Sequence, residues 1–239
     1  MARYAELHCH SNFSFLDGAS SPGDLVARAV ELGYAALAIT DHDGLRGAPR
    51  FRLAAEGTGL KTVYGTEVGL PREERPTREG RDTGAAPSAA CGRASPAPAG
   101  DCQQTGSASP SAASGRASPA PAGEARRGRT HRMHGAKPLL LPPTDHLVLL
   151  APDPAGYAAL SGLVTRAQFR GEKDRPVYSW EDLAEAAAVG RLVALTGCRQ
   201  GAVPRAAQEG DLEGAMRAAA RLRKVFPARL FVEVWHHGM

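Results

Sequence analysis

Apolar residues along the chain occur either in short buried runs or in longer stretches with helical spacing. The short runs predict six strands, at residues 4–7, 35–40, 61–67, 146–151, 191–196 and 230–235. The amphipathic stretches predict helices at residues 21–33, 44–57, 154–169, 179–187 and 211–226. Strands that alternate with helices are typical of a parallel α/β barrel, so we expect an incomplete barrel with about six strands.

One long segment, residues 72–137, breaks this pattern. From Pro71 to Arg132 the chain has no Val, Ile, Leu, Met, Phe, Tyr or Trp, and the sequence of 88–100 recurs at 111–123 with one substitution. A segment with nothing apolar to bury cannot offset a backbone entropy cost of about 1–2 kcal/mol per residue. We therefore predict a disordered insertion between a first barrel part at 1–71 and a second part at 138–239.

The net charge of +4 comes from this insertion. Residues 72–137 hold 11 of the 29 Lys and Arg residues but only 6 of the 25 Asp and Glu residues. The rest of the chain, with 18 basic and 19 acidic residues, gives no charge argument for DNA binding. The four cysteines form no paired framework, and no run of eighteen apolar residues occurs. These features predict a cytoplasmic protein without a membrane segment.

Metal-ligating residue types follow the first three predicted strands. His8 and His10 end the first strand, His42 follows the second and Glu67 ends the third. Side chains alternate faces along a strand, so positions 8 and 10 can share a metal while Cys9 points to the other face. Strands that end in such donors predict a metal site at the C-terminal rim of the barrel. Nitrogen and carboxylate donors suit zinc, manganese or iron and do not select among them.

The roles of four further residues are not decided by the pattern alone. Asp41 and Asp43 flank His42. Each could orient the imidazole as a residue that supports a metal ligand, or could cap the following helix. His146 precedes its strand, which is the wrong end for a ligand at this rim. Cys198 follows the fifth strand and is either a soft metal ligand or a buried apolar cysteine.

Several motifs together resemble one known family. They are His8-Cys9-His10-Ser11, Phe15-Leu16-Asp17-Gly18, Leu37-Ala38-Ile39-Thr40-Asp41-His42 and Gly65-Thr66-Glu67. These motifs are similar to the opening motifs of the polymerase-and-histidinol-phosphatase (PHP) domain. The stretches AELHCHSNFSFLDGASSP and ALAITDHDGLRGAPRF most resemble the PHP domain that begins bacterial C-family DNA polymerases, on the error-prone branch used in damage-induced mutagenesis and translesion synthesis. The resemblance covers residues 4–70 and about 139–238.

The resemblance implies an irregular barrel of seven strands and helices that binds up to three divalent metal ions. It implies metal-dependent phosphoester hydrolysis, which in polymerase-linked domains is 3′-to-5′ removal of nucleotides. The implied partners are DNA, through the full-length polymerase, and other replication or mutagenesis proteins. The implied ligands are His8, His10, Asp17, His42, Glu67, His146 and Cys198.

One departure from the family pattern limits these expectations. The seventh strand and its Asp-x-His motif have no counterpart before Met239, so seven of nine ligand positions are present and the chain looks truncated. We therefore expect metal binding with weak or absent hydrolysis of DNA ends. Two alternatives stay open: a structural metal-binding module of a polymerase, and a free-standing phosphoesterase of the histidinol-phosphatase type.

Overall fold

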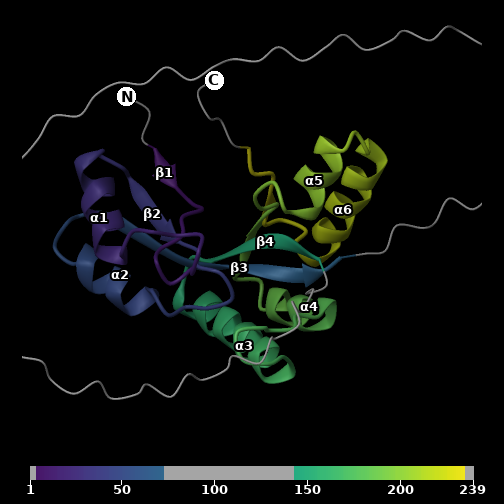
Figure 1. Cartoon of the computed structure of the whole chain (residues 1–239), viewed down its shortest axis with the longest axis horizontal. Helices are drawn as coiled ribbons and strands as arrows, with labels where there is room; N and C mark the ends of the chain where they lie inside the picture. The colour runs from purple at the N-terminus through teal and green to yellow at the C-terminus, as the bar shows by residue number, and fades with distance from the viewer. Residues whose placement is uncertain (1–3, 73–142, 235–239) are drawn as a thin grey trace, which may run out of the picture. The chain divides into compact units, whose positions relative to one another are not determined.

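The computed structural model describes residues 4–72 and 143–234, which all fall in one compact unit (Figure 1). Within these ranges the chain forms one curled sheet of six strands with six helices packed against it. The α/β class and the number of strands are confirmed. The predicted insertion lies, apart from Arg72, outside the described residues, so its disorder stays a prediction.

The strands follow one another across the sheet in chain order. They are β1 (Ala5–Glu6), β2 (Ala36–Ile39), β3 (Lys61–Pro71), β4 (Thr144–Ala151), β5 (Val193–Leu195) and β6 (Leu230–Phe231). The pairs β1–β2, β2–β3 and β5–β6 are parallel, as expected. In contrast, β4 runs antiparallel to both β3 and β5, so the sheet is mixed.

The reversal of β4 has a cause in the sequence. Pro71 at the end of β3 pairs with Thr144 at the start of β4, as in a hairpin with a very long connection. A parallel pair needs a crossover, usually a helix, and no helical pattern lies between these two strands. The prediction of a parallel barrel was wrong at this strand, which runs antiparallel to both of its neighbours.

Six helices connect or follow the strands. They are α1 (Pro22–Glu31), α2 (Ala48–Ala55), α3 (Pro154–Arg170), α4 (Trp180–Ala188), α5 (Ala202–Gln208) and α6 (Leu212–Val225). Four of them begin at a side chain that accepts a hydrogen bond from a backbone N–H of the first turn; these caps are Ser21, Asp153, Ser179 and Asp211. The short helix α5 was not predicted, because only Ala206 in it is buried and no periodicity marks it.

The two faces of the sheet carry different apolar clusters. Most of the core lies between the sheet and its helices, around α1 and α2 on one part and α3, α4 and α6 on the other. A smaller cluster of Ala38, Val148, Leu150 and Leu195 covers the opposite face. Strand alternation places Glu67 on the face of Val63, which packs against this smaller cluster, and His146 on the face of Val148. The smaller cluster therefore forms an apolar layer on the same face as Glu67 and His146.

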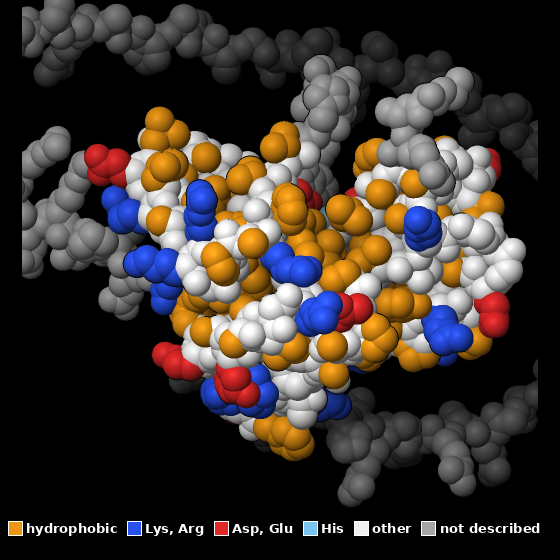
Figure 2. Space-filling view, turned by 180° about the vertical axis from the view of Figure 1, so that it is seen from behind, with side chains coloured by type: hydrophobic (Ala, Val, Ile, Leu, Met, Phe, Trp, Pro, Cys, Tyr) orange, Lys and Arg blue, Asp and Glu red, His pale blue; other side chains and the backbone are white. Residues whose placement is uncertain are grey.

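Charged side chains of both signs are interspersed over the face shown in Figure 2. This distribution agrees with the nearly neutral balance of the sequence outside residues 72–137. None of the helices within the described ranges has the length and apolar character needed to cross a bilayer.

Candidate metal centre

Glu67 on β3 lies at the centre of the predicted site and is only 1% exposed. Its backbone is tied to the segment that carries His42: the Asp43 N–H donates to the Glu67 carbonyl at 2.9 Å, and the Glu67 N–H donates to the Asp41 carbonyl at 3.2 Å. This isolated bridge continues the β2–β3 pairing beyond the end of β2. It holds the His42 ring beside the Glu67 carboxylate.

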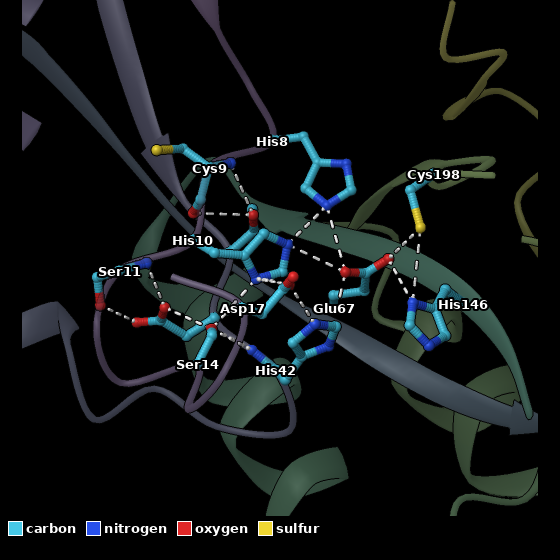
Figure 3. Close-up of polar contacts among 12 residues, drawn as sticks. His8, Cys9, His10, Ser11, Ser14, Asp17, His42, Glu67, His146 and Cys198 are labelled. Atoms are coloured by element: carbon cyan, nitrogen blue, oxygen red, sulfur yellow. Dashed lines mark hydrogen bonds and ion pairs between the residues drawn. The ribbon is translucent and has the colours of Figure 1, made fainter. Parts of the chain in front are cut away.

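Three histidines face one oxygen of this carboxylate (Figure 3). Glu67 Oε2 lies 3.3 Å from His8 Nε2, 3.1 Å from His10 Nε2 and 3.6 Å from His42 Nδ1. His8 and His10 lie beyond β1, yet their Nε2 atoms are 3.0 Å apart, while Cys9 packs against the apolar cluster of α1 and α2. The alternation expected for a strand is thus kept past the last residue of β1.

The other carboxylate oxygen faces residues from β4 and the segment after β5. Glu67 Oε1 lies 3.0 Å from His146 Nδ1 and 3.4 Å from Cys198 Sγ, and these two donors are 3.6 Å apart. His146 reaches the site because β4 is antiparallel: its first residues lie at the rim where the parallel strands end. The early position of His146 in its strand is therefore the one from which it can reach the site.

Asp17 completes the set of seven residues that the sequence assigned to the site. Its Oδ2 atom lies 2.9 Å from His42 Nε2 and 3.7 Å from His10 Nδ1, and its side chain is 57% exposed. Three overlapping trios have ligand atoms within 4.8 Å of one another; they are His8–His10–Glu67, His10–Asp17–His42 and His42–Glu67–His146. The geometry therefore brings all seven side chains together, with Asp17 on the solvent side.

Electrostatics inside the cluster favour positive charge around Glu67. Burial alone raises the pKa of Glu67, but hydrogen bonds from His10, His146 and His8 hold it well below its usual range. Burial lowers the pKa of His8, yet hydrogen bonds to Glu233 and Glu67 outweigh this effect and raise it to about 10. His146 behaves alike, because Cys198 and Glu67 raise its pKa to about 10 against the effect of burial. The positive charge that Glu67 stabilises on these rings is charge that a divalent cation could supply instead.

Asp41 supports the site through two serines that sequence reasoning missed. Its carboxylate accepts hydrogen bonds from the Ser11 N–H, the Ser11 hydroxyl and the Ser14 hydroxyl, at 2.7–2.8 Å. Ser14 Oγ also accepts from the His42 N–H and lies 3.1 Å from His10 Nδ1. Because the one hydroxyl hydrogen points to Asp41, Nδ1 of His10 is the donor in the contact with Ser14. Nε2 is then the nitrogen that faces Glu67 and could bind a metal.

Asp43 occupies a different environment, beside Tyr178. It adopts a left-handed backbone conformation, with φ of 53°, and burial raises the pKa of its carboxyl against the opposing influence of His42 and the Tyr178 hydroxyl. Capping of the next helix is excluded for both Asp41 and Asp43, because α2 begins after Gly47 and has no side-chain cap.

Comparison with known proteins agrees with this arrangement. The family model of the PHP domain matches residues 6–237. The chain belongs to the PHP domain family. As a PHP domain it is similar to curated proteins named error-prone DNA polymerase. It shares 36% identity with the one from Mycobacterium tuberculosis over 240 residues, which is 98% of this chain and 16% of that protein.

Two other relatives give the same result. The error-prone DNA polymerase of Cutibacterium acnes is 37% identical over 226 residues, covering 93% of this PHP domain and 14% of the relative. The error-prone DNA polymerase of Nocardia farcinica is 38% identical over 245 residues, which cover 99% of this PHP domain and 19% of the relative. The chain thus spans less than a fifth of the length of the curated relatives it matches.

Proposed function

We propose that this chain is the PHP domain of a DNA polymerase of the error-prone type, and that its rim cluster binds divalent cations and hydrolyses phosphodiesters at DNA 3′ ends. The observation that carries the proposal is the grouping of five donor side chains around Glu67, with Asp17 beside two of them. Both oxygens of that carboxylate face donors from other elements.

The donor set fits a divalent metal on each side of Glu67. His8 and His10 with Oε2 make one group of three ligands, and His146 and Cys198 with Oε1 make another. Catalytic zinc sites typically use three protein ligands and keep a further position open, whereas structural sites use four. A bound divalent cation lowers the pKa of a coordinated water and stabilises negative charge on a phosphate oxygen.

The individual side chains indicate which metals suit each side. The Cys198 thiol and the imidazole of His146 form a soft pair that favours zinc. The opposite side, with imidazoles and carboxylates only, accepts manganese or iron as readily as zinc. We therefore propose zinc, manganese or iron as the cofactors, without a requirement that both sides hold the same metal.

DNA is the substrate that the relatives' name suggests, since those proteins are named as DNA polymerases. The exposed side of the centre, marked by Asp17, is where a DNA end would approach. In the full-length polymerase we propose DNA and other replication or mutagenesis proteins as partners, in a cytoplasmic setting.

A second candidate function is a structural metal module that stabilises a polymerase without hydrolysis. Burial of the ligands favours it: His8 and Glu67 are both buried, and the ligands come from β3 and β4 and from the segments that follow β1, β2 and β5. A cation there would tie those five parts of the sheet together. An assay that follows hydrolysis and metal binding side by side separates the two functions.

The test uses the purified chain, a 5′-labelled DNA primer, and manganese or zinc. We expect slow shortening of the primer from its 3′ end that requires the metal and is abolished in a His8→Ala, His10→Ala double variant. An exposed carboxylate variant, Glu56→Gln, serves as the matched control and should keep the activity. Unchanged primer with full metal binding would contradict hydrolysis and support the structural module; shortening that survives the double variant would show that another nuclease is present.

A further inference from the structure

Glu233 contacts the metal centre from the far edge of the sheet. Its Oε1 atom lies 2.7 Å from His8 Nδ1, and the two side chains are only 13% and 3% exposed. His8 follows β1 and Glu233 follows β6, the two edge strands of the six-stranded sheet. The contact therefore joins the two edges of the curled sheet at the centre itself.

The distance determines which nitrogen of His8 carries a hydrogen. A ring nitrogen 2.7 Å from a carboxylate oxygen is the donor of that hydrogen bond, so Nδ1 is protonated whatever the charge of the ring. Nε2 is then the nitrogen left to bind a cation. That atom points to Glu67 Oε2 at 3.3 Å and to His10 Nε2 at 3.0 Å.

Glu233 is itself held in place by the backbone and by β5. The Glu233 N–H donates to Thr196 Oγ1 at 2.9 Å, and the Thr196 N–H donates to the Phe231 carbonyl at 3.0 Å. Thr196 is 1% exposed and follows the last residue of β5. These bonds extend the β5–β6 pairing beyond β6, so the Glu233 side chain is directed at His8 by the sheet and not by a free loop.

We propose that Glu233 is a positioning residue for the metal centre: its carboxylate fixes the His8 ring with Nδ1–H bound and Nε2 directed at the cation site. The metal part of this inference rests on the proposed function. Carboxylates that hold the far nitrogen of a ligating histidine typically change metal affinity 10- to 100-fold when they are removed. The loss follows because the ring can then rotate, or present a protonated nitrogen to the cation.

The experiment compares Glu233→Ala, which removes the acceptor, with Glu233→Gln, which keeps an acceptor oxygen of nearly the same size. Zinc affinity is measured by calorimetric titration. The exchange of the His8 Nδ1 proton with solvent is measured by NMR in metal-free and zinc-loaded protein. Glu213→Gln, a carboxylate whose side chain is 91% exposed, is the matched control.

We expect Glu233→Ala to weaken zinc binding 10- to 100-fold and to make the His8 proton exchange rapidly, while Glu233→Gln recovers most of both properties. The control should behave as the wild type. A merely structural role for Glu233 would lower the stability of both variants without this selective effect on the His8 proton.

Zinc affinity within about twofold of wild type and a slowly exchanging His8 proton in Glu233→Ala would overturn the proposal. If the wild-type chain binds no zinc, the proposed metal centre fails. The proton exchange in the metal-free protein then still decides whether Glu233 holds His8.

Discussion

Glu67 Oε1 lies 3.0 Å from His146 Nδ1 although the two residues belong to strands that run in opposite directions. In the β3–β4 register Glu67 pairs with Val148, so His146 is two positions nearer the rim and on the same face. The antiparallel strand β4 thus supplies a donor from near its beginning, whereas the donors of β1, β2 and β5 follow the last residues of those strands. This relationship gives the carboxylate a separate set of donors on each oxygen.

The two sides of Glu67 should be separable by mutation. We predict that His146→Ala or Cys198→Ala removes one of two bound cations and leaves the other, because neither residue faces Oε2. His8→Ala should remove the cation on the Oε2 side and spare that on the Oε1 side. The measurement is metal content per chain after dialysis against a defined zinc buffer. Loss of all metal in every variant would show a single, indivisible site.

Ser14→Ala should weaken metal binding without unfolding the chain. The variant loses the hydroxyl that links Asp41 to His10 Nδ1 and to the His42 N–H. A buried acceptor and donor left without partners cost about 1–3 kcal/mol, and a lost ligand support lowers metal affinity roughly 10- to 100-fold. Zinc titration and urea unfolding measure the two effects. The exposed Ser20→Ala variant is the control, and equal behaviour of the two variants would refute the role of Ser14.

Gly18→Ala should disturb the loop that carries Asp17. A Cβ atom at Gly18 would overlap the carbonyl oxygen of Ser11, which is backbone and cannot move aside easily. We predict a loss of about 1–3 kcal/mol in the free energy of unfolding, as for other overpacked sites. Gly23→Ala is the matched control, because its Cβ would meet only Ser21 Oγ at 3.7 Å. Loss of glycine's freedom in the unfolded chain favours both variants, so a thermal unfolding temperature of Gly18→Ala that is no lower than that of Gly23→Ala would contradict the overlap with Ser11.

Asp182 should contribute stability that is lost in acid. The hydrogen bond from Arg170, with help from Ser179 and Arg166, lowers the pKa of Asp182 from 3.8 to about 2. A carboxyl group with a lowered folded-state pKa stabilises the fold above its unfolded pKa, and this contribution disappears as the pH falls from about 4 towards 2. The difference in unfolding free energy between wild type and Asp182→Asn should therefore be constant near pH 6 and shrink below pH 4. A difference that does not change with pH would contradict the assignment.

Local sequence rules were enough to predict much of the fold and of the metal cluster. Donor residues at predicted strand ends pointed to His8, His10, His42 and Glu67, because period-two alternation is read from neighbouring residues. The predicted end at Glu67 was wrong, since β3 continues to Pro71 in its pairing with β4. His146 was assigned by resemblance alone, since strand direction depends on pairing between residues far apart in sequence.

The supporting residues were missed for a related reason. Glu233 lies 225 residues from His8, and only the curling of the sheet brings them together. Ser14 looks like an ordinary loop serine until the backbone places it between Asp41 and His10. Side chains that orient ligands have no spacing rule of their own, because they can come from any element that reaches the site.

The most direct test of the central claim is a calorimetric titration of the metal-free chain with zinc, repeated for Glu67→Gln and the exposed control Glu56→Gln. If Glu67 bridges two sets of donors, the wild type and the control bind at least two zinc ions per chain. Glu67→Gln should then bind at least a hundredfold more weakly, because the carboxylate is the one group shared by both sides. A wild-type chain that binds no zinc, or a Glu67→Gln variant that binds as tightly as the wild type, would contradict the account.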